Sequence, residues 1–325
     1  MARFPTVADV LAAAQRLRDV AVRTPLEPSL QLAEESGAAE VRLKLEMLQP
    51  TGAFKLRGAE NKVALLAAED MGQRLVAAST GNHGIAVAAA AARHGMRLTV
   101  LVPASVSPAK LERLRALESD RCVIEVFGRE PDDVEIEARR RDDEGIATYV
   151  PPYNDADVVA GAATVGLEIT EDWPDCDAIV VPIGGGGLIS GIGLWAKAVR
   201  PGLRLVGVQP TASPPMYAYF ESNSMKPMPI APTLADGVAG NIERGSITWK
   251  MARQLVDEVV LVDEAQIADG MRWMADAHHL IVEGSAALGV AALRARLGQL
   301  DGRRVAVVIS GRNVDMGIFR AALDQ

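Results

Sequence analysis

The stretch AIVVPIGGGGLIS, residues 178–190, runs from an apolar segment through four glycines into a helical pattern. The segment from Ala178 to Ile183 is continuously apolar, as a strand buried on both faces of a parallel sheet requires. The glycines that follow let backbone N–H groups converge on an anion, and a helix predicted over Leu188–Val199 adds its dipole. The stretch therefore predicts a strand, a phosphate-binding loop and a helix.

Two other interpretations of the glycine loop compete with phosphate binding. One is a flexible turn, although four consecutive glycines are costly in entropy where nothing approaches the backbone closely. The other is a dinucleotide-binding loop, which would need a glycine at 189 or 190, where Ile189 and Ser190 stand, and an acidic residue near Gln209. No Gly-Lys pair occurs in the chain, which excludes a P-loop. A monophosphate fits this loop better than a dinucleotide.

Strand and helix patterns alternate along the whole chain. We predict strands at 41–46, 75–79, 97–102, 122–127, 147–150, 178–183, 203–208, 259–262 and 305–309, and helices at 7–20, 55–68, 83–93, 108–117, 131–144, 158–172, 188–199, 264–277 and 285–296. Strands separated by helices imply right-handed crossovers and parallel sheets covered on both faces. The expected fold class is α/β, with two lobes of parallel-rich twisted sheets flanked by helices. A proline-rich piece, Pro210 to Pro232, is expected to be irregular and to cover a site.

The charge balance limits the partners of the protein. Among 325 residues, 34 are Lys or Arg and 42 are Asp or Glu, so the net charge is −8. Binding to a nucleic acid or an anionic membrane would call for a basic face, and no apolar run approaches the roughly 18 residues of a membrane-spanning helix. The two cysteines, Cys122 and Cys176, have neither metal-ligand nor disulfide spacing. We therefore expect a cytoplasmic protein with a small-molecule substrate.

Lys55 stands out among the seven lysines of the chain. It follows an aromatic residue in the segment PTGAFKLRGA, residues 50–59, at a predicted helix start. The helix N-terminus and the nearby Arg57 would both lower the pKa of its ammonium and favour a nucleophilic amine. A solvated lysine at a helix start is the competing interpretation. Lys44 is expected on the polar side of its strand, and the other five lysines have no special neighbours.

The segment ASTGNHG, residues 78–84, lies between a predicted strand and an Ala-rich helix. Hydroxyls, an amide and free N–H groups at a helix start form a site for a carboxylate or phenolate oxygen. The same side chains could instead cap the helix. His83 alone is more often a structural hydrogen-bonding residue than a catalyst.

These motifs together resemble a known family over nearly the whole chain. They are Phe54-Lys55-x-Arg57-Gly58-Ala59, Ser79-Thr80-Gly81-Asn82-His83, the glycine loop, Ala235-Asp236-Gly237, Glu283 and Ser310-Gly311-x-Asn313-Val314-Asp315. Their order resembles that of fold-type II pyridoxal-phosphate enzymes, in the threonine/serine dehydratase and serine racemase branch. The resemblance implies a tryptophan synthase β-like fold. Its large cofactor-binding domain would comprise residues 1–72 and 151–325, and its small α/β domain residues 73–150.

The resemblance also implies roles for individual residues. Lys55 would hold pyridoxal 5′-phosphate covalently and remove the substrate Cα proton. Around the cofactor would lie Phe54 near the ring, Asn82 at the ring 3′-oxygen, Gly184, Gly185, Gly186 and Gly187 at the phosphate, Glu283 close to the ring and Ser310 at the pyridine nitrogen. Around the substrate carboxylate would lie Ser79, Thr80, Gly81 and His83. Thr80 stands where racemases use a serine to reprotonate the opposite face, so it could donate a proton.

The reaction implied is that of an ammonia-lyase. A neutral Ser310 hydroxyl stabilises a protonated pyridine less than a carboxylate would, which weakens the ring as an electron sink and favours elimination over transamination. Water would leave a β-hydroxy-α-amino acid such as threonine or serine, giving a 2-oxo acid and ammonia. The alternatives are a serine-type racemase and a dehydratase acting on a hydroxyectoine-derived amino acid. A nucleotide-binding oxidoreductase and a non-catalytic binding module are more distant ones.

Several positions depart from the family pattern. Arg312 replaces a glycine and is expected to bring a cation to the nitrogen side of the ring. The acids that bind a divalent metal in the family are replaced by Gln209, Ser213 and Pro215, so we expect no metal site and weak or absent metal dependence. The chain ends at Gln325, and we expect neither a C-terminal regulatory domain nor isoleucine feedback. The family is commonly dimeric, so a homodimer is expected.

Overall fold

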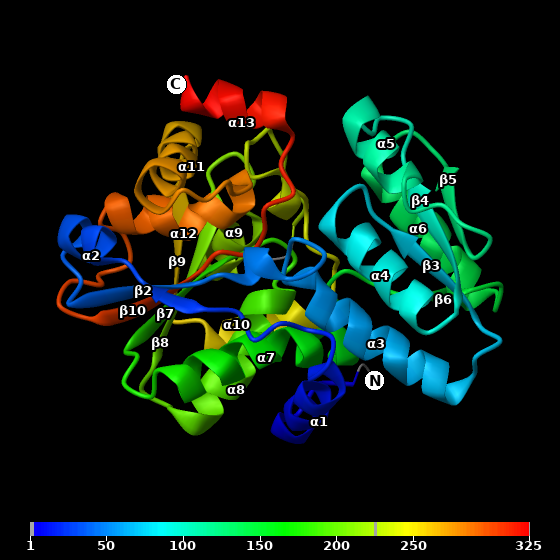
Figure 1. The fold of residues 1–325 in the computed structure, drawn as a ribbon, viewed down its shortest axis with the longest axis horizontal. Coiled ribbons are helices and arrows are strands. Elements are labelled where there is room, and N and C mark those ends of the chain that lie inside the picture. Colours follow the sequence, from blue (N-terminus) through cyan, green and yellow to red (C-terminus); the bar gives the residue numbers. More distant parts are fainter. Residues whose placement is uncertain (1–2, 224–225, 325) are drawn as a thin grey trace.

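Two sheets organise the protein in the computed structural model, which describes residues 3–223 and 226–324 (Figure 1). The first has the strand order β1 (Leu26–Pro28), β2 (Glu40–Lys44), β10 (Arg304–Val308), β7 (Ala178–Pro182), β8 (Arg204–Pro210) and β9 (Glu258–Val262). The second has the order β5 (Cys122–Val126), β4 (Arg97–Val102), β3 (Arg74–Ala78) and β6 (Thr148–Tyr149). Every strand pairing described in these sheets is parallel except β1 with β2. The predicted α/β class with parallel-rich sheets is confirmed.

Helices cover both sheets. They are α1 (Val7–Leu17), α2 (Leu30–Ser36), α3 (Lys55–Glu69), α4 (Asn82–Arg93), α5 (Pro108–Arg115), α6 (Pro131–Asp143), α7 (Ala156–Asp172), α8 (Gly187–Val199), α9 (Pro215–Ser222), α10 (Ile247–Leu255), α11 (Glu264–His278), α12 (Gly284–Arg294) and α13 (Met316–Leu323), with short 3₁₀ turns η1 (Glu46–Leu48) and η2 (Asp236–Val238). Strand β7 is buried at every position, as its apolar sequence predicts. Apolar residues of α7 and α8 pack on one face of the large sheet, and those of α11 and α12 pack on the other.

Several predicted boundaries are wrong in an informative way. The strand expected at 41–46 ends at Lys44, because the chain turns into η1 at Glu46. The proline-rich segment from 210 to 232 is not irregular throughout, since its residues 215–222 form α9 with Pro215 in the first turn, where the missing N–H costs nothing. Helix α1 ends at Leu17 rather than at residue 20. The short elements β1, α2, α10 and α13 were not predicted.

The helix that begins at Lys55 is held close to α7. A Cβ on Gly58 would lie 2.7 Å from the Val158 carbonyl oxygen, and one on Gly161 would lie 2.4 Å from the Arg57 carbonyl oxygen. Side chains at either position would force the two helices apart, so the glycines permit this crossing. The packing fixes the start of α3 against the segment that leads from the small sheet into α7.

Candidate functional site

One pocket collects the residues singled out from the sequence. It opens between the two sheets, beside the loops that follow the carboxyl ends of β3, β7 and β10, where ligands of open α/β sheets usually bind. All the predicted cofactor and substrate residues line it: Phe54, Lys55, Ser79, Thr80, Gly81, Asn82, His83, Gly184, Gly185, Gly186, Gly187, Glu283 and Ser310. Residues that lie more than 250 positions apart in the chain therefore share one cavity.

The glycine loop is shaped for an anion. Gly186 adopts a left-handed conformation (φ 85°) and caps the N-terminus of α8. A Cβ on Gly185 would lie 2.3 Å from the Tyr153 ring, so the loop backbone lies against that ring as closely as glycine allows. Among the hydrogen bonds of the described chain, none is donated by the backbone N–H groups of residues 184–187. These unused donors at a helix N-terminus fit a phosphate group.

The Lys55 amine lies in the same pocket as the glycine loop. Its Nζ donates a hydrogen bond of 2.7 Å to the carbonyl oxygen of Pro152. Burial lowers the pKa of Lys55 to about 8, although the negative charge of Glu283 acts in the other direction. A lysine with a pKa near neutrality is a competent nucleophile and base. The interpretation as a solvated lysine is therefore not supported.

The sequence-based reason for the low pKa of Lys55 is partly wrong. Lys55 and Arg57 are two residues apart on a helix, which separates their directions by about 200°. Arg57 accordingly points away from the pocket and forms ion pairs of 2.7 Å with Glu46 and with Glu168. Burial, and not the Arg57 charge, accounts for the lowered pKa of Lys55.

This pKa predicts how fast the protein would bind, through Lys55, the pyridoxal phosphate that the resemblance implies. At pH 8 about half of Lys55 is the neutral amine, against roughly 0.3% for a lysine at 10.5. We expect the second-order rate of covalent cofactor binding to the cofactor-free protein to rise with pH and to level off above about 8. Stopped-flow absorbance between pH 6.5 and 10.5 measures it. A midpoint above 10 would contradict the role of burial.

A polar chain connects Glu283 to the C-terminal motif. The Asn82 amide donates to both carboxylate oxygens of Glu283, at 2.9 and 3.0 Å, and its own oxygen accepts a hydrogen bond of 2.7 Å from Asn313. Burial raises the pKa of Glu283 to about 7, with a further rise from the Asp236 charge, while the Asn82 hydrogen bond opposes it. Glu283 can therefore hold a proton near neutral pH beside the pocket.

The loop at residues 79–81 leads into α4, whose first two residues are Asn82 and His83. Its N-cap is Gly81, which has no side chain to cap the helix, so the capping interpretation of this segment is wrong. The Ser79 hydroxyl accepts a hydrogen bond of 3.2 Å from the Gly81 N–H. His83 is buried, with Nε2 2.8 Å from the Val150 carbonyl oxygen, and burial together with the Lys55 charge lowers its pKa to about 3. The imidazole is thus neutral, and any anion bound here would depend on hydrogen bonds.

Ser310 reaches the pocket through backbone pairing with the lysine segment. Its carbonyl oxygen accepts a hydrogen bond of 3.0 Å from the Phe54 N–H, and Ala53 forms an isolated bridge with Gly311.

The expectation that Arg312 brings a cation to the nitrogen side of the ring is wrong. Its side chain is exposed and is not among the residues that line the pocket.

Three pocket residues, Lys110, Tyr153 and Ser285, were missed or misjudged from the sequence. Lys110, expected to have no special neighbour, lines the pocket and forms an ion pair of 2.5 Å with Asp236. Tyr153 packs on the glycine loop, and its hydroxyl accepts a hydrogen bond from the Glu243 N–H. The buried Ser285 hydroxyl also lines the pocket and has no hydrogen-bond partner in the described chain. Only the position of Asp236 and Gly237 in a motif pointed toward this part of the wall.

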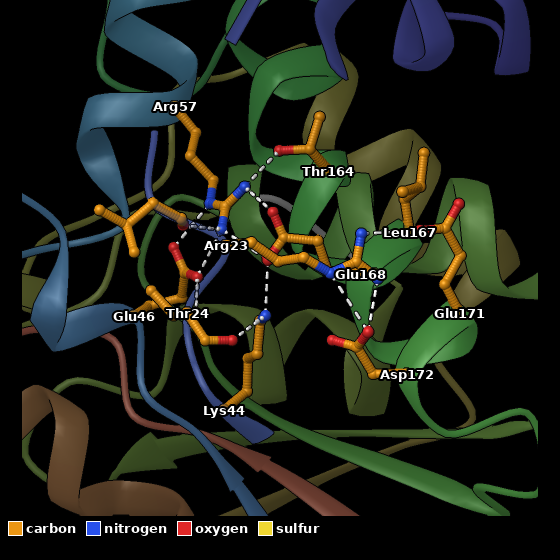
Figure 2. A network of polar contacts seen from close by, with 12 residues as sticks. Arg23, Thr24, Lys44, Glu46, Arg57, Thr164, Leu167, Glu168, Glu171 and Asp172 are labelled. Atoms are coloured by element: carbon orange, nitrogen blue, oxygen red, sulfur yellow. Dashed lines mark hydrogen bonds and ion pairs between the residues drawn. The ribbon is translucent and has the colours of Figure 1, made fainter. Parts of the chain in front are cut away.

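Behind the lysine lies a buried ionic cluster, shown in Figure 2. The Arg57 guanidinium lies between Glu46 and Glu168, and Lys44 reaches Glu168 at 2.5 Å and the Thr24 carbonyl oxygen at 2.7 Å. Lys44 is fully buried, so its expected place on a polar strand face is wrong. Although burial alone would raise the pKa of Glu46, the Arg57 and Lys44 charges lower it overall. Two cations and two anions make the cluster neutral.

The positions expected to have lost a metal site are engaged elsewhere. The Gln209 side-chain oxygen accepts a hydrogen bond of 2.9 Å from the Tyr217 N–H, and the Ser213 hydroxyl accepts one of 3.1 Å from the Gly240 N–H. Within residues 3–223 and 226–324, no group of three or more His, Cys, Asp or Glu side chains is arranged to hold a metal ion.

Comparison with known proteins places the chain in a family. A family profile described as "Pyridoxal-phosphate dependent enzyme" matches residues 17–311. The chain belongs to this family. The expected cofactor class is thereby confirmed, and the unused N–H groups of the glycine loop and the Lys55 amine in one pocket fit it. No helix in the described part of the chain has the length and apolarity to span a membrane.

Relatives within this pyridoxal-phosphate family extend over nearly the whole chain. An L-threonine ammonia-lyase of Thermotoga maritima is 39% identical and covers 97% of this chain and 77% of its own length. An L-threo-3-hydroxyaspartate ammonia-lyase of Saccharomyces cerevisiae is 33% identical, covering 96% and 94%. The structure of maize serine racemase superimposes with a TM-score of 0.90 at 29% identity, covering 99% and 98%. The expected fold and branch of the family are confirmed.

Proposed function

We propose that the protein is an ammonia-lyase that removes water from a β-hydroxy-α-amino acid such as threonine or serine. The products would be a 2-oxo acid and ammonia. The observation that carries the proposal is the shared pocket of three groups: the Lys55 amine, the glycine loop and the neutral Ser310 hydroxyl. The name of the Thermotoga relative, L-threonine ammonia-lyase, supports the same reaction.

Each residue would have a distinct task. Bound in the pocket, pyridoxal phosphate would supply an electron-withdrawing ring that makes the substrate Cα–H acidic. The N–H groups of Gly184 to Gly187 would hold its phosphate. Lys55 Nζ would take the Cα proton, which its pKa of about 8 permits near neutral pH. Loss of water and hydrolysis of the released enamine, after tautomerisation to an imine, would complete the reaction.

The start of α4 is suited to the substrate carboxylate. The N–H groups at a helix N-terminus attract an anion, and the hydroxyls of Ser79 and Thr80 line the pocket beside them. Because His83 is neutral, it would contribute a hydrogen bond rather than a charge. Asn82 and Glu283 would stay near the ring of the cofactor, with Phe54 packed against it.

A racemase is the second candidate, and Thr80 is the observation that favours it. Its side chain is half-buried, lines the pocket, and makes no hydrogen bond to any described residue. A free hydroxyl there could return a proton to the opposite face of Cα. Serine racemase of maize shares the fold. The dehydratase of a hydroxyectoine-derived amino acid remains a variant of the first proposal with another substrate.

The products distinguish these candidates. The loaded enzyme is incubated with L-threonine, L-serine and a hydroxyectoine-derived amino acid. Ammonia and 2-oxo acid are measured enzymatically, and the remaining amino acid is resolved by chiral chromatography. We expect 2-oxo acid and ammonia in equal amounts. Formation of the mirror-image amino acid without ammonia would replace the lyase by the racemase.

Chelation tests the metal expectation. Because the Gln209 oxygen is already engaged and no acidic cluster stands nearby in the described chain, we expect EDTA to leave kcat/KM within about twofold. Steady-state assays before and after dialysis, with Mg²⁺ and Ca²⁺ added back, provide the measurement. A loss that either ion restores would show a metal site.

We also propose the domain division and the assembly expected from the sequence. Strands β3 to β6 all fall within residues 73–150, and the other strands fall within 1–72 and 151–325, which supports the two domains at those bounds. A cytoplasmic homodimer is proposed on the family pattern alone. Light scattering coupled to gel filtration would give its mass.

A further inference from the structure

The charged side chains of the pocket wall do not favour binding of a second carboxylate on the substrate. The charged residues lining it are Lys55, Lys110, Glu135, Asp236 and Glu283. Lys55 is needed for the chemistry of the proposed function, which leaves Lys110 as the other described cation of the wall. His83 is neutral. A substrate side chain that carries a second carboxylate would therefore meet mostly acids.

The charge of Lys110 is already paired with that of Asp236. The Lys110 Nζ lies 2.5 Å from Asp236 Oδ2, in an ion pair that joins α5 to η2 at the pocket wall. To bind a substrate carboxylate, Lys110 would have to leave Asp236, and the Asp236 carboxylate would then repel the newcomer. The Asp236 carboxylate therefore competes with any second carboxylate of a substrate for Lys110.

Helix α6 also contributes to the pocket wall, and its described residues there offer no free cation. Its pocket residues are Val134, which is 3% exposed, and the acidic Glu135. Arg139, one turn later, is turned to Glu135 at 2.8 Å and to Glu243 at 2.6 Å. The Val134 side chain also packs in a buried apolar cluster with residues of β3 and β4, so the small surface that it presents to the pocket is apolar and offers nothing to a carboxylate.

We propose that Val134 and Asp236 are specificity-determining residues that restrict this enzyme to β-hydroxy amino acids with a neutral side chain. The proposal rests on the proposed function. It matters because the relatives include an L-threo-3-hydroxyaspartate ammonia-lyase, so the reaction alone leaves the side-chain charge of the substrate open. Val134 places an uncharged side chain at its position in the wall. Asp236 forms an ion pair with Lys110, so that cation is not free to bind a substrate carboxylate.

Two independent variants test the two residues. Val134→Arg adds a cation to the wall, and Asp236→Asn releases Lys110. Each is expected to raise kcat/KM for L-threo-3-hydroxyaspartate relative to L-threonine by about ten- to a hundredfold, the usual effect of one charge-assisted hydrogen bond. Ile136→Arg is the matched control, because it adds the same charge to α6 at a side chain that is 66% exposed. The gain from Asp236→Asn should disappear when Lys110→Met is added.

Binding provides a readout besides turnover. Calorimetric titration of the loaded protein compares succinate with butyrate, which has four carbons but one carboxylate. We expect the natural protein to bind succinate no more tightly than butyrate. Val134→Arg and Asp236→Asn should each tighten succinate binding about tenfold or more, with butyrate unchanged. Since Asp236→Asn inserts nothing into the wall, it keeps the test open if Val134→Arg fails to fold.

The outcomes separate this proposal from the proposed function. If the natural enzyme turns over 3-hydroxyaspartate as well as threonine, or if both variants leave the substrate ratio and succinate binding unchanged, the specificity proposal is overturned and the ammonia-lyase stands. If no ammonia forms from L-threonine, L-serine or the hydroxyectoine-derived amino acid, the ammonia-lyase proposal is overturned. The succinate and butyrate titrations then decide the role of the two residues by themselves.

Discussion

Lys55→Ala should abolish the reaction and the covalent attachment of the cofactor together. The amine lies in the pocket with the glycine loop, and no other described lysine except Lys110, held by Asp236, lines that pocket. Loss of both a nucleophile and a base predicts a fall in kcat of at least about a thousandfold. Reduction with borohydride followed by peptide mass mapping should label residue 55 in the natural protein and leave the variant unlabelled at that peptide.

Folding should survive this substitution. A lysine whose pKa is lowered to about 8 is charged at a cost in the folded state at pH 7, so its removal is not expected to reduce stability. Thermal melting of the cofactor-free proteins checks this. Lys250→Ala, at an exposed lysine, is the control and should keep turnover and labelling. A Lys55→Ala enzyme that still releases ammonia would overturn the assignment of the amine.

The parts of the site that sequence predicted are those built from short contiguous segments. The glycines at 184–187 and the segment at 79–83, a loop and the first residues of α4, each follow a strand whose apolar pattern is clear, and parallel strands bring their carboxyl ends to one edge. A strand followed by such a loop is therefore enough to place the loop at the pocket. Lys55 needed more, because its low pKa depends on burial between separate segments rather than on its neighbours in sequence.

The remaining parts depend on partners that are distant in the chain. The alternating strand pattern predicts Lys44 on a polar face, yet the ion pair with Glu168, 124 residues later, allows Lys44 to be buried. The sequence around Lys110 shows no special neighbour, because its partner Asp236 is 126 residues away. Ion pairs of this kind leave no local pattern, so the sequence reveals the presence of the charge but not the position of its partner. Helix α9 was missed because its prolines suggested a loop, although a proline in the first turn is compatible with a helix.

Arg57→Met should cause the largest loss of stability. The side chain is 1% exposed and bonds Glu46, Glu168 and Thr164 (Figure 2). Its removal leaves two buried carboxylates with Lys44 as their one cation, and an uncompensated buried charge costs about 3–5 kcal/mol. For a chain of 325 residues this corresponds to a fall in Tm of about 4 to 7 °C, measured by calorimetry of the loaded enzyme.

Arg23→Met is the control for this loss of stability. Arg23 pairs with Glu171 and Asp172 at the end of α7, the helix that also carries Glu168, but its side chain is half exposed. An exposed pair contributes less than about 1 kcal/mol. Adding Glu168→Gln to Arg57→Met restores neutrality, with one lysine facing one carboxylate, and should cost less than the sum of the two single changes. Simple additivity would mean that the residues stabilise the fold as separate contacts. A Tm unchanged by Arg57→Met would show that the guanidinium does no more than offset its own desolvation, since Lys44 alone would then suffice to keep both carboxylates buried.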